Sequence, residues 1–148
     1  MVNSSSQAAA LAEFAALLGA EGMLTDESSV EEYRDPFREQ ATSGEPPLAV
    51  LSPANVEEVQ EVVRIASRYG VPMWTGSMSR NYGYGASEPR VPGSVIVSLR
   101  RMNRVLEIDD ESGTVIIEPG VTFFDLYNAL REAGSRLWLS VPDLGWGS

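Results

Sequence analysis

Residues 48–75 read LAVLSPANVEEVQEVVRIASRYGVPMWT, and this stretch gives the clearest indication of the fold class. The apolar runs at its two ends, LAVLS and VPMWT, are typical of short strands. Between them, Asn55 precedes a helical pattern and has Glu58 three residues on, which is a capping-box arrangement. Gly70 follows as a left-handed helix cap. Strand, helix and strand in this order predict a βαβ unit with parallel strands and a right-handed crossover. The expected buried stripe of the helix is Val56, Val59, Val62, Val63 and Ala66.

On the N-terminal side, residues 1–46 are expected to form one helix and an arm. Apolar residues recur there at helical spacing, at Leu11, Phe14, Leu17 and Leu18. This spacing predicts an amphipathic helix from about Gln7 to Leu18 that stops at Gly19. The segment from about Glu21 to Pro47 is polar and contains DESS, YRDPF and SGEPP. We interpret it as an irregular arm that wraps the domain.

On the C-terminal side, three strand-like runs follow one another: SVIVSL, RVLEID and TVIIEP. Their close spacing, with short turns and no intervening helix, predicts an antiparallel meander. Thr122 then caps a helix that ends at Gly134 and carries Phe123, Leu126, Tyr127 and Leu130. A last short strand, RLWLSV, is expected before PDLGWGS. The predicted class is α+β with mixed strand pairing.

Composition restricts the chemistry that this chain can do. Its 148 residues suit one domain, and the net charge of −10 argues against nonspecific binding to nucleic acid or anionic membranes. Without cysteine and histidine, thiolate catalysis and the commonest metal ligand and general base are excluded within the chain, and no metal site is expected. Chemistry must then use carboxylates, tyrosine, backbone dipoles or a bound cofactor. No signal peptide or membrane-spanning stretch is evident, so we expect a soluble, cytoplasmic protein.

The loop GSMSRNYGYGA, residues 76–86, follows the second strand of the βαβ unit. Open α/β sheets bind ligands at the carboxyl ends of their strands, so this place favours a ligand site. The loop is neither a dinucleotide GxGxxG nor a P-loop. The residues alone leave a phosphate-cradling loop and an ordinary connection equally open. Tyr82 and Tyr84 lie two residues apart and point to opposite sides if the loop is extended.

The final residues, PDLGWGS, form a second candidate segment. Asp143 stands between a proline and a glycine-rich turn, where an aspartate commonly caps its own turn. The functional alternative is that the backbone comes close to a ligand and the carboxylate faces it. The chain stops inside this turn, as a truncated chain would. The acidic runs EEVQE and DDES are interpreted as solvated faces, and EPGVTFFDL as a strand, a turn and a helix start.

Taken in order, five segments resemble the vanillyl-alcohol oxidase and para-cresol methylhydroxylase family. They are PANVEEVQEVVRIASRYGVPM, SMSRNYGYGASEPRVPGSVIVSL, RMNRVLEID, EPGVTFFDLYNAL and LWLSVPDLGWGS. The resemblance implies that residues 47–148 are the first part of a PCMH-type (para-cresol methylhydroxylase-type) FAD-binding domain. The rest of that domain, a substrate-cap domain and any residue that links the flavin covalently are then expected downstream. The blocks RNYGYGASEPRVPGS and PDLGWGS point to members that act on para-substituted phenols, of the 4-alkylphenol, vanillyl alcohol or eugenol type.

The resemblance also implies where FAD is held. Backbone amides of the loop from Gly76 to Gly85 would bind the diphosphate, because successive N–H groups satisfy phosphate oxygens without a cationic side chain. Ser79 departs from the glycine usual in the family. The implied cofactor contacts are Gly76, Ser77, Met78, Ser79, Arg80, Asn81, Gly83, Tyr84, Gly85, Pro119, Gly120, Val121, Pro142, Asp143, Leu144, Gly145, Gly147 and Ser148.

Two residues carry over to catalysis through the same resemblance. Tyr84 matches a tyrosine that holds the substrate oxygen as phenolate, and Asp143 matches an aspartate beside flavin N5. The implied reaction is hydride transfer from the para benzylic carbon to flavin N5 through a quinone methide, with O2 or another electron acceptor and a dimeric or larger enzyme. Two alternatives stay open: a hydroxy-acid or sugar oxidoreductase of the wider superfamily, and a catalytically inert isolated chain.

Overall fold

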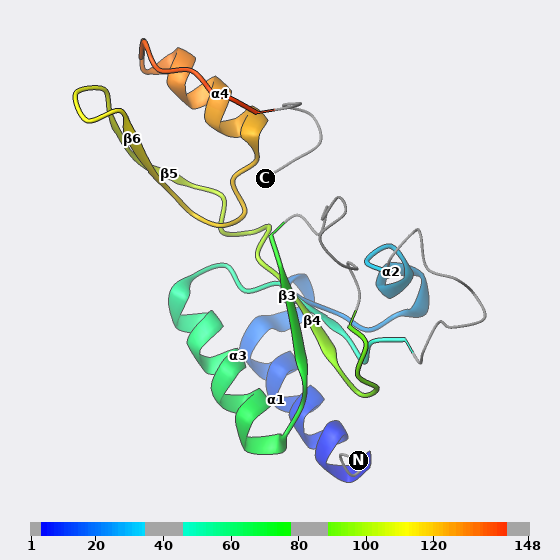
Figure 1. The fold of residues 1–148 in the computed structure, drawn as a ribbon. Helices are drawn as coiled ribbons and strands as arrows, with labels where there is room; N and C mark the ends of the chain where they lie inside the picture. The colour runs from blue at the N-terminus through cyan, green and yellow to red at the C-terminus, as the bar shows by residue number, and fades with distance from the viewer. Residues whose placement is uncertain (1–3, 35–45, 78–88, 142–148) are drawn as a thin grey trace.

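The structure, a computed structural model, describes residues 4–34, 46–77 and 89–141, which form two units (Figure 1). The larger unit is a four-stranded sheet with helices on it. Its elements are α1 (Ser4–Gly22), β1 (Met23–Leu24), α2 (Glu27–Glu31), β2 (Val50–Leu51), α3 (Val56–Tyr69), β3 (Met73–Gly76) and β4 (Val95–Ser98). The smaller unit is a hairpin with one helix. Its elements are β5 (Val105–Asp109), β6 (Thr114–Ile117) and α4 (Phe123–Glu132).

The strand order in the larger unit is β1-β2-β4-β3. Both β2 and β3 pair parallel to β4, so the two strands of the predicted βαβ unit run parallel, as expected, but they are not neighbours. The run SVIVSL, predicted as the first strand of a meander, is instead the central parallel strand. All four residues of β4 are buried. The continuous apolar run Val95–Val97 is typical of a parallel strand covered on both faces, and the short spacing to the next run outweighed this signal in the prediction.

The main core lies between the sheet and the two long helices, which run side by side on one face (Figure 1). Within α3 the predicted stripe is partly wrong. Val62 and Ala66 are buried, whereas Val56 and Val63 are 54% and 46% exposed, and Ile65 is buried in their place. The predicted helix end at Gly19 is a kink, because Gly19 has a φ of 65° and helical residues continue to Gly22.

Both ends of α3 are capped as the sequence predicts. Asn55 accepts a hydrogen bond from the Glu58 backbone N–H at 2.8 Å, and Gly70 has a left-handed φ of 67°. The Glu58 carboxylate accepts from the Ala54 N–H at 2.7 Å, one residue before the N-cap, so the reciprocal bond is displaced from a strict capping box.

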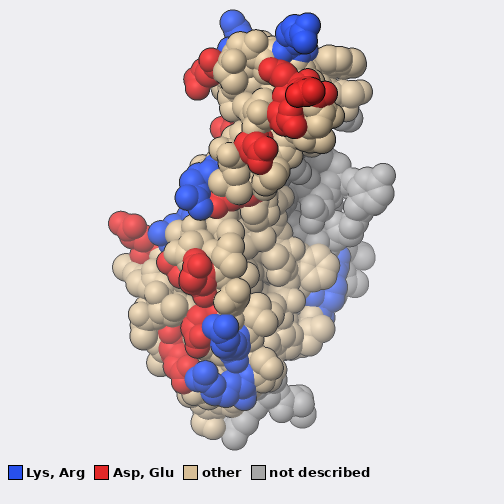
Figure 2. All heavy atoms as spheres, turned by 90° about the vertical axis from the view of Figure 1, so that its left-hand side faces the viewer, with Lys and Arg blue, Asp and Glu red and all other residues tan. Residues whose placement is uncertain are grey.

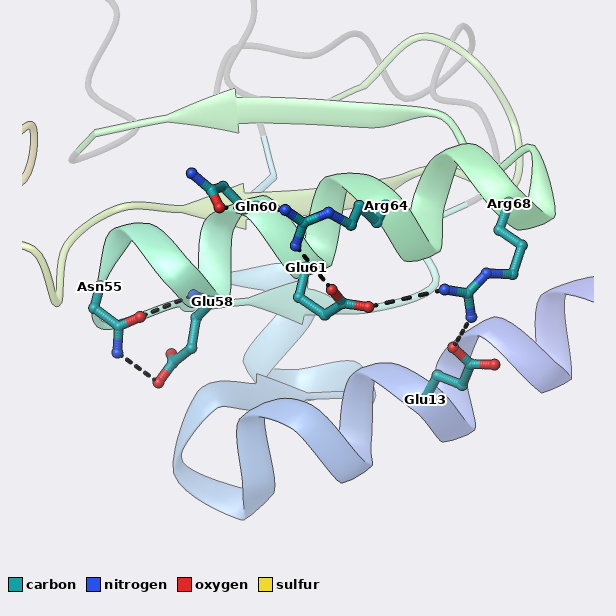
Figure 3. Close-up of polar contacts among 7 residues, drawn as sticks. All are labelled: Glu13, Asn55, Glu58, Gln60, Glu61, Arg64 and Arg68. Atoms are coloured by element: carbon teal, nitrogen blue, oxygen red, sulfur yellow. Dashed lines mark hydrogen bonds and ion pairs between the residues drawn. The ribbon is translucent and has the colours of Figure 1, made fainter.

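A small polar cluster joins α1 to α3 at their exposed edge (Figure 3). Arg68 donates to the Glu13 carboxylate at 2.7 Å, and its other terminal nitrogen lies 3.8 Å from Glu61. The Tyr69 hydroxyl donates to Glu13 at 2.6 Å, and this bond raises the pKa of Tyr69. Because these charges are substantially exposed, their contribution to stability is about 1 kcal/mol or less.

The expectation of an irregular arm after Glu21 is wrong for its first part. This part contains β1 and α2, and Asp26 is the N-cap of α2, where its carboxylate accepts from the Ser29 N–H at 2.9 Å. The hydrogen bond from the Ser28 hydroxyl and this bond from the Ser29 N–H lower the pKa of Asp26 to about 2. Val30 of α2 packs on Val50 and Ile96. A five-residue helix is too short to show a helical period, so the polar composition concealed it.

The smaller unit contains the predicted hairpin and helix. β5 and β6 pair antiparallel, and Thr122 and Asp125 form a capping box at the start of α4. The predicted strand RLWLSV is not formed among residues 136–141. Leu137 and Leu139 pack against the cluster around α4, while Trp138 is 80% exposed. The alternation therefore reflects an irregular segment lying on the hairpin and helix.

Candidate cofactor-binding site

Five of the predicted cofactor contacts lie in the described part of the chain: Gly76, Ser77, Pro119, Gly120 and Val121. The remaining contacts lie outside the described residues. They are Met78, Ser79, Arg80, Asn81, Gly83, Tyr84, Gly85, Pro142, Asp143, Leu144, Gly145, Gly147 and Ser148. The roles of Tyr84 and Asp143 therefore stay predictions.

Gly76 is the last residue of β3 and pairs with Ser98, the last residue of the neighbouring β4. The Leu99 N–H donates to the Gly76 carbonyl at 2.9 Å. β3 and β4 are parallel, so their carboxyl ends lie at the same edge of the sheet. This is the edge at which open α/β sheets bind ligands. Gly76, where the predicted diphosphate loop begins, thus lies at this edge of the sheet.

Gly120 lies where no other residue fits. A Cβ atom on Gly120 would come within 2.3 Å of the Leu99 carbonyl oxygen, 2.8 Å of that of Met102 and 2.9 Å of that of Arg100. The Gly120 N–H also donates to the Met102 carbonyl at 2.7 Å, and the Met102 N–H donates to the Leu99 carbonyl at 3.0 Å. Because three backbone carbonyls surround Gly120, only a residue without a side chain allows this close approach.

Leu99 connects the two predicted cofactor segments. Its N–H binds Gly76 at the start of the loop, and its carbonyl lies against Gly120 in the turn that begins the second segment. Residues 76 and 120, far apart in the sequence, are thereby brought to the same place at the sheet edge. Sequence reasoning expected a short turn between SVIVSL and RVLEID, but not that the carbonyl groups of this turn would lie against Gly120.

The three residues of the turn 119–121 differ in how exposed they are to a ligand. Pro119 is exposed, but Val121 is 3% exposed and belongs to the apolar cluster around α4. The Val121 N–H donates to the Glu118 carbonyl at 3.1 Å. Among these three residues, Pro119 is therefore the one with a side chain at the surface.

Glu118 holds this turn against the hairpin. Its side chain is 7% exposed and accepts three hydrogen bonds from Arg104, from the backbone N–H at 2.8 Å, Nη2 at 2.7 Å and Nε at 3.1 Å. These bonds hold the pKa of Glu118 below its usual value and raise that of Arg104. The carboxylate is ionised and fully engaged, so it serves the fold of the turn.

Asp109, another carboxylate of the smaller unit, also serves a turn. Asp109 accepts from the Ser112 hydroxyl and from the N–H groups of Glu111 and Ser112. These bonds lower the pKa of Asp109 and close the turn between β5 and β6.

Figure 2 shows acidic and basic side chains near one another on the face that it presents. Within the described ranges there is no group of three or more carboxylates suited to a metal ion, and no helix there is long and apolar enough to cross a bilayer.

Residues 47–148 match the FAD binding domain family. The chain belongs to this family. It is 35% identical over 131 residues to the 4-cresol dehydrogenase [hydroxylating] flavoprotein subunit of Pseudomonas putida, covering 88% of the chain and 25% of that protein. It is 42% identical over 132 residues to the 1'-carboxy-chondrochloren decarboxylase of Chondromyces crocatus, covering 89% of the chain and 24% of that protein.

A solved structure of 4-ethylphenol oxidase from Gulosibacter chungangensis, in complex with isoeugenol, superimposes with a TM-score of 0.89 at 40% identity. It covers 99% of the present chain and 28% of the oxidase chain. These similarities confirm the predicted family, the mixed α and β fold and FAD as the cofactor. The chain spans about a quarter of the length of the curated relatives it matches.

The described residues fit a bound FAD. The close packing at Gly120 places the 119–121 turn beside the end of β3, where the diphosphate loop begins. Gly76 and Ser77 are half-buried at this edge, so the cofactor contact expected at these two residues is compatible with their position.

Proposed function

We propose that the complete protein is an FAD-dependent oxidoreductase that oxidises para-substituted phenols at the benzylic carbon. The observation that carries the proposal is the similarity to a 4-ethylphenol oxidase along almost the whole chain, together with that to a 4-cresol dehydrogenase. Bound FAD supplies the hydride acceptor in this chemistry. The isolated 148 residues, a quarter of the length of such relatives, are expected to be inactive.

Tyr84 is proposed to bind the phenolic oxygen of the substrate. A tyrosine hydroxyl donates a hydrogen bond to an oxyanion, and a bond to a charged acceptor is stronger than one to a neutral acceptor. Stabilising the phenolate makes the ring electron-rich, which favours loss of hydride from the para benzylic carbon. The substrate then becomes a quinone methide.

Asp143 is proposed to act on the step that follows. A carboxylate beside the reacting benzylic carbon can take the proton of a water molecule that adds to the quinone methide. O2 or another electron acceptor completes the cycle, and we expect the complete enzyme to be a dimer or larger.

The test compares Tyr84→Phe with Tyr82→Phe in the complete protein. Both changes remove one hydroxyl from the same loop, so they share any general effect on loop folding. We expect Tyr84→Phe to slow anaerobic reduction of the flavin by 4-ethylphenol by roughly tenfold or more, while FAD stays bound. Tyr82→Phe should retain the wild-type rate. Equal rates in the two variants would remove Tyr84 from phenolate binding.

Oxidative removal of a carboxyl group is a second candidate, favoured by the 42% identity to a decarboxylase. The two functions differ in the substrate and in the product. A phenol oxidase converts 4-alkylphenols without releasing CO2, whereas a decarboxylase requires a carboxylated substrate and releases it. Measuring CO2 from a 4-hydroxyphenyl substrate that carries a side-chain carboxyl group, in parallel with 4-ethylphenol turnover, separates them.

A further inference from the structure

Ser98 is a buried polar residue whose side chain has no hydrogen bond among the described residues. It ends the central strand β4 and has no exposed surface. Its Oγ has no hydrogen-bond partner in the described part of the chain. Nearly all buried hydroxyl groups in proteins are hydrogen-bonded, because an unpaired one loses its bonds to water without replacement. An exception calls for a physical reason.

A second buried serine, at the other end of the same strand, does have a hydrogen-bond partner. Ser94 comes just before β4 and is also buried, but its hydroxyl donates to the Val91 carbonyl at 2.5 Å. The two ends of β4 therefore differ in whether the buried serine hydroxyl is hydrogen-bonded. The serine at the amino end is satisfied, whereas the serine at the carboxyl end, where the cofactor loop begins, is not.

The position of Ser98 relates it to this loop. Ser98 pairs with Gly76 across the β3–β4 ladder, and the residue after it, Leu99, binds the Gly76 carbonyl. Side chains alternate along a strand, so Ser98 lies on the same side of the sheet as Ile96, the side that packs on Val30 and Val50. The unpaired hydroxyl is thus next to the first residue of the predicted diphosphate loop.

We propose that Ser98 is a positioning residue of the FAD site. Its hydroxyl forms its hydrogen bond in the cofactor-bound protein and fixes Gly76 and Ser77, the start of the diphosphate loop. The hydroxyl is fully covered by protein, so it acts through this backbone and not by touching the cofactor. The proposal rests on FAD binding and is independent of the phenol specificity proposed above.

The proposal makes opposite predictions for two serine-to-alanine variants of the complete protein. Ser98→Ala should weaken the initial, non-covalent binding of FAD by roughly three- to tenfold, the equivalent of one hydrogen bond, when apoprotein is titrated and quenching of flavin fluorescence is followed. The unfolding midpoint of its apoprotein should stay unchanged or rise, because the lost hydroxyl was unpaired. Ser94→Ala should show the reverse pattern, with a lower apoprotein midpoint and unchanged FAD affinity.

Two results would overturn the proposal. Unchanged FAD affinity in Ser98→Ala would show that the hydroxyl takes no part in cofactor binding. A fall in the apoprotein midpoint of Ser98→Ala comparable to that of Ser94→Ala would show that the hydroxyl is already bonded without the cofactor. Neither measurement uses a phenol, so failure of the proposed substrate class leaves this test intact.

Discussion

At the scale of single residues, Gly120 has the tightest surroundings of the candidate site. We predict that Gly120→Ala destabilises the complete protein by about 3 kcal/mol or more, because a methyl group 2.3 Å from a backbone carbonyl oxygen forces the backbone apart. The unfolding midpoint in urea measures this loss. FAD affinity should fall too, since the same shift separates the 119–121 turn from Leu99.

Gly134→Ala is the matched control for this prediction. Gly134 has a φ of 65° and open space where a Cβ would lie, so alanine there costs only the left-handed backbone strain of about 1 kcal/mol. If Gly120→Ala were as mild as Gly134→Ala, the three carbonyls could not be packed on Gly120 as described.

Glu118 contributes to the free energy of unfolding in a way that depends on pH, and the direction of this dependence can be predicted. Its pKa is lowered in the folded protein by the bonds from Arg104, so the folded state favours the ionised form. The resulting stability is fully present above the unfolded pKa of about 4.3 and is lost as the pH falls through the lower folded pKa. We expect Glu118→Gln to be less stable than wild type near pH 6 and the gap to close in acid.

Urea unfolding of both proteins from about pH 6 to about pH 3 measures this gap. Glu107→Gln, at an exposed position of the same hairpin, controls for the loss of one negative charge. A gap between wild type and Glu118→Gln that stayed constant down to pH 3 would contradict the role given to the Arg104 bonds.

At the scale of elements, the N-cap of α3, the helix of the βαβ unit, can be tested by substitution. Asn55→Ala removes the cap from the Glu58 N–H and should cost about 1 kcal/mol of unfolding free energy. Asn128→Ala, at an exposed position inside α4, should change stability by less than about 0.5 kcal/mol. Equal effects of the two changes would mean that the Asn55 bond does not stabilise α3.

The elements that sequence reasoning placed correctly carry local signals. Asn55, Gly70 and Thr122 mark helix ends through bonds or backbone angles within a few residues, and the structure has each of them. The errors concern pairing and short segments. Nothing local in SVIVSL shows that it inserts between β2 and β3, because strand neighbours are set by tertiary packing. Likewise α2 depends on Val30 finding a place against Val50 and Ile96.

At the scale of the whole molecule, the two units meet where the predicted cofactor segments begin. The loop start at Gly76 and the turn at Gly120 were predicted from a family resemblance, but their junction through Leu99 could only come from the fold. The same holds for Ser98, since a single serine in an apolar run gives no sign that its hydroxyl will be unpaired. Sequence patterns identify segments that approach a ligand, whereas contacts between those segments depend on the chain's path in three dimensions.

The most direct test of the proposed function is anaerobic mixing of the complete, FAD-loaded protein with two classes of substrate. One class is para-alkylphenols, represented by 4-ethylphenol and 4-cresol, and the other is small 2-hydroxy acids. We predict that the phenols bleach the visible absorbance of the oxidised flavin rapidly and that the hydroxy acids do not. Bleaching by a hydroxy acid, with none by either phenol, would contradict the assignment to phenol oxidation.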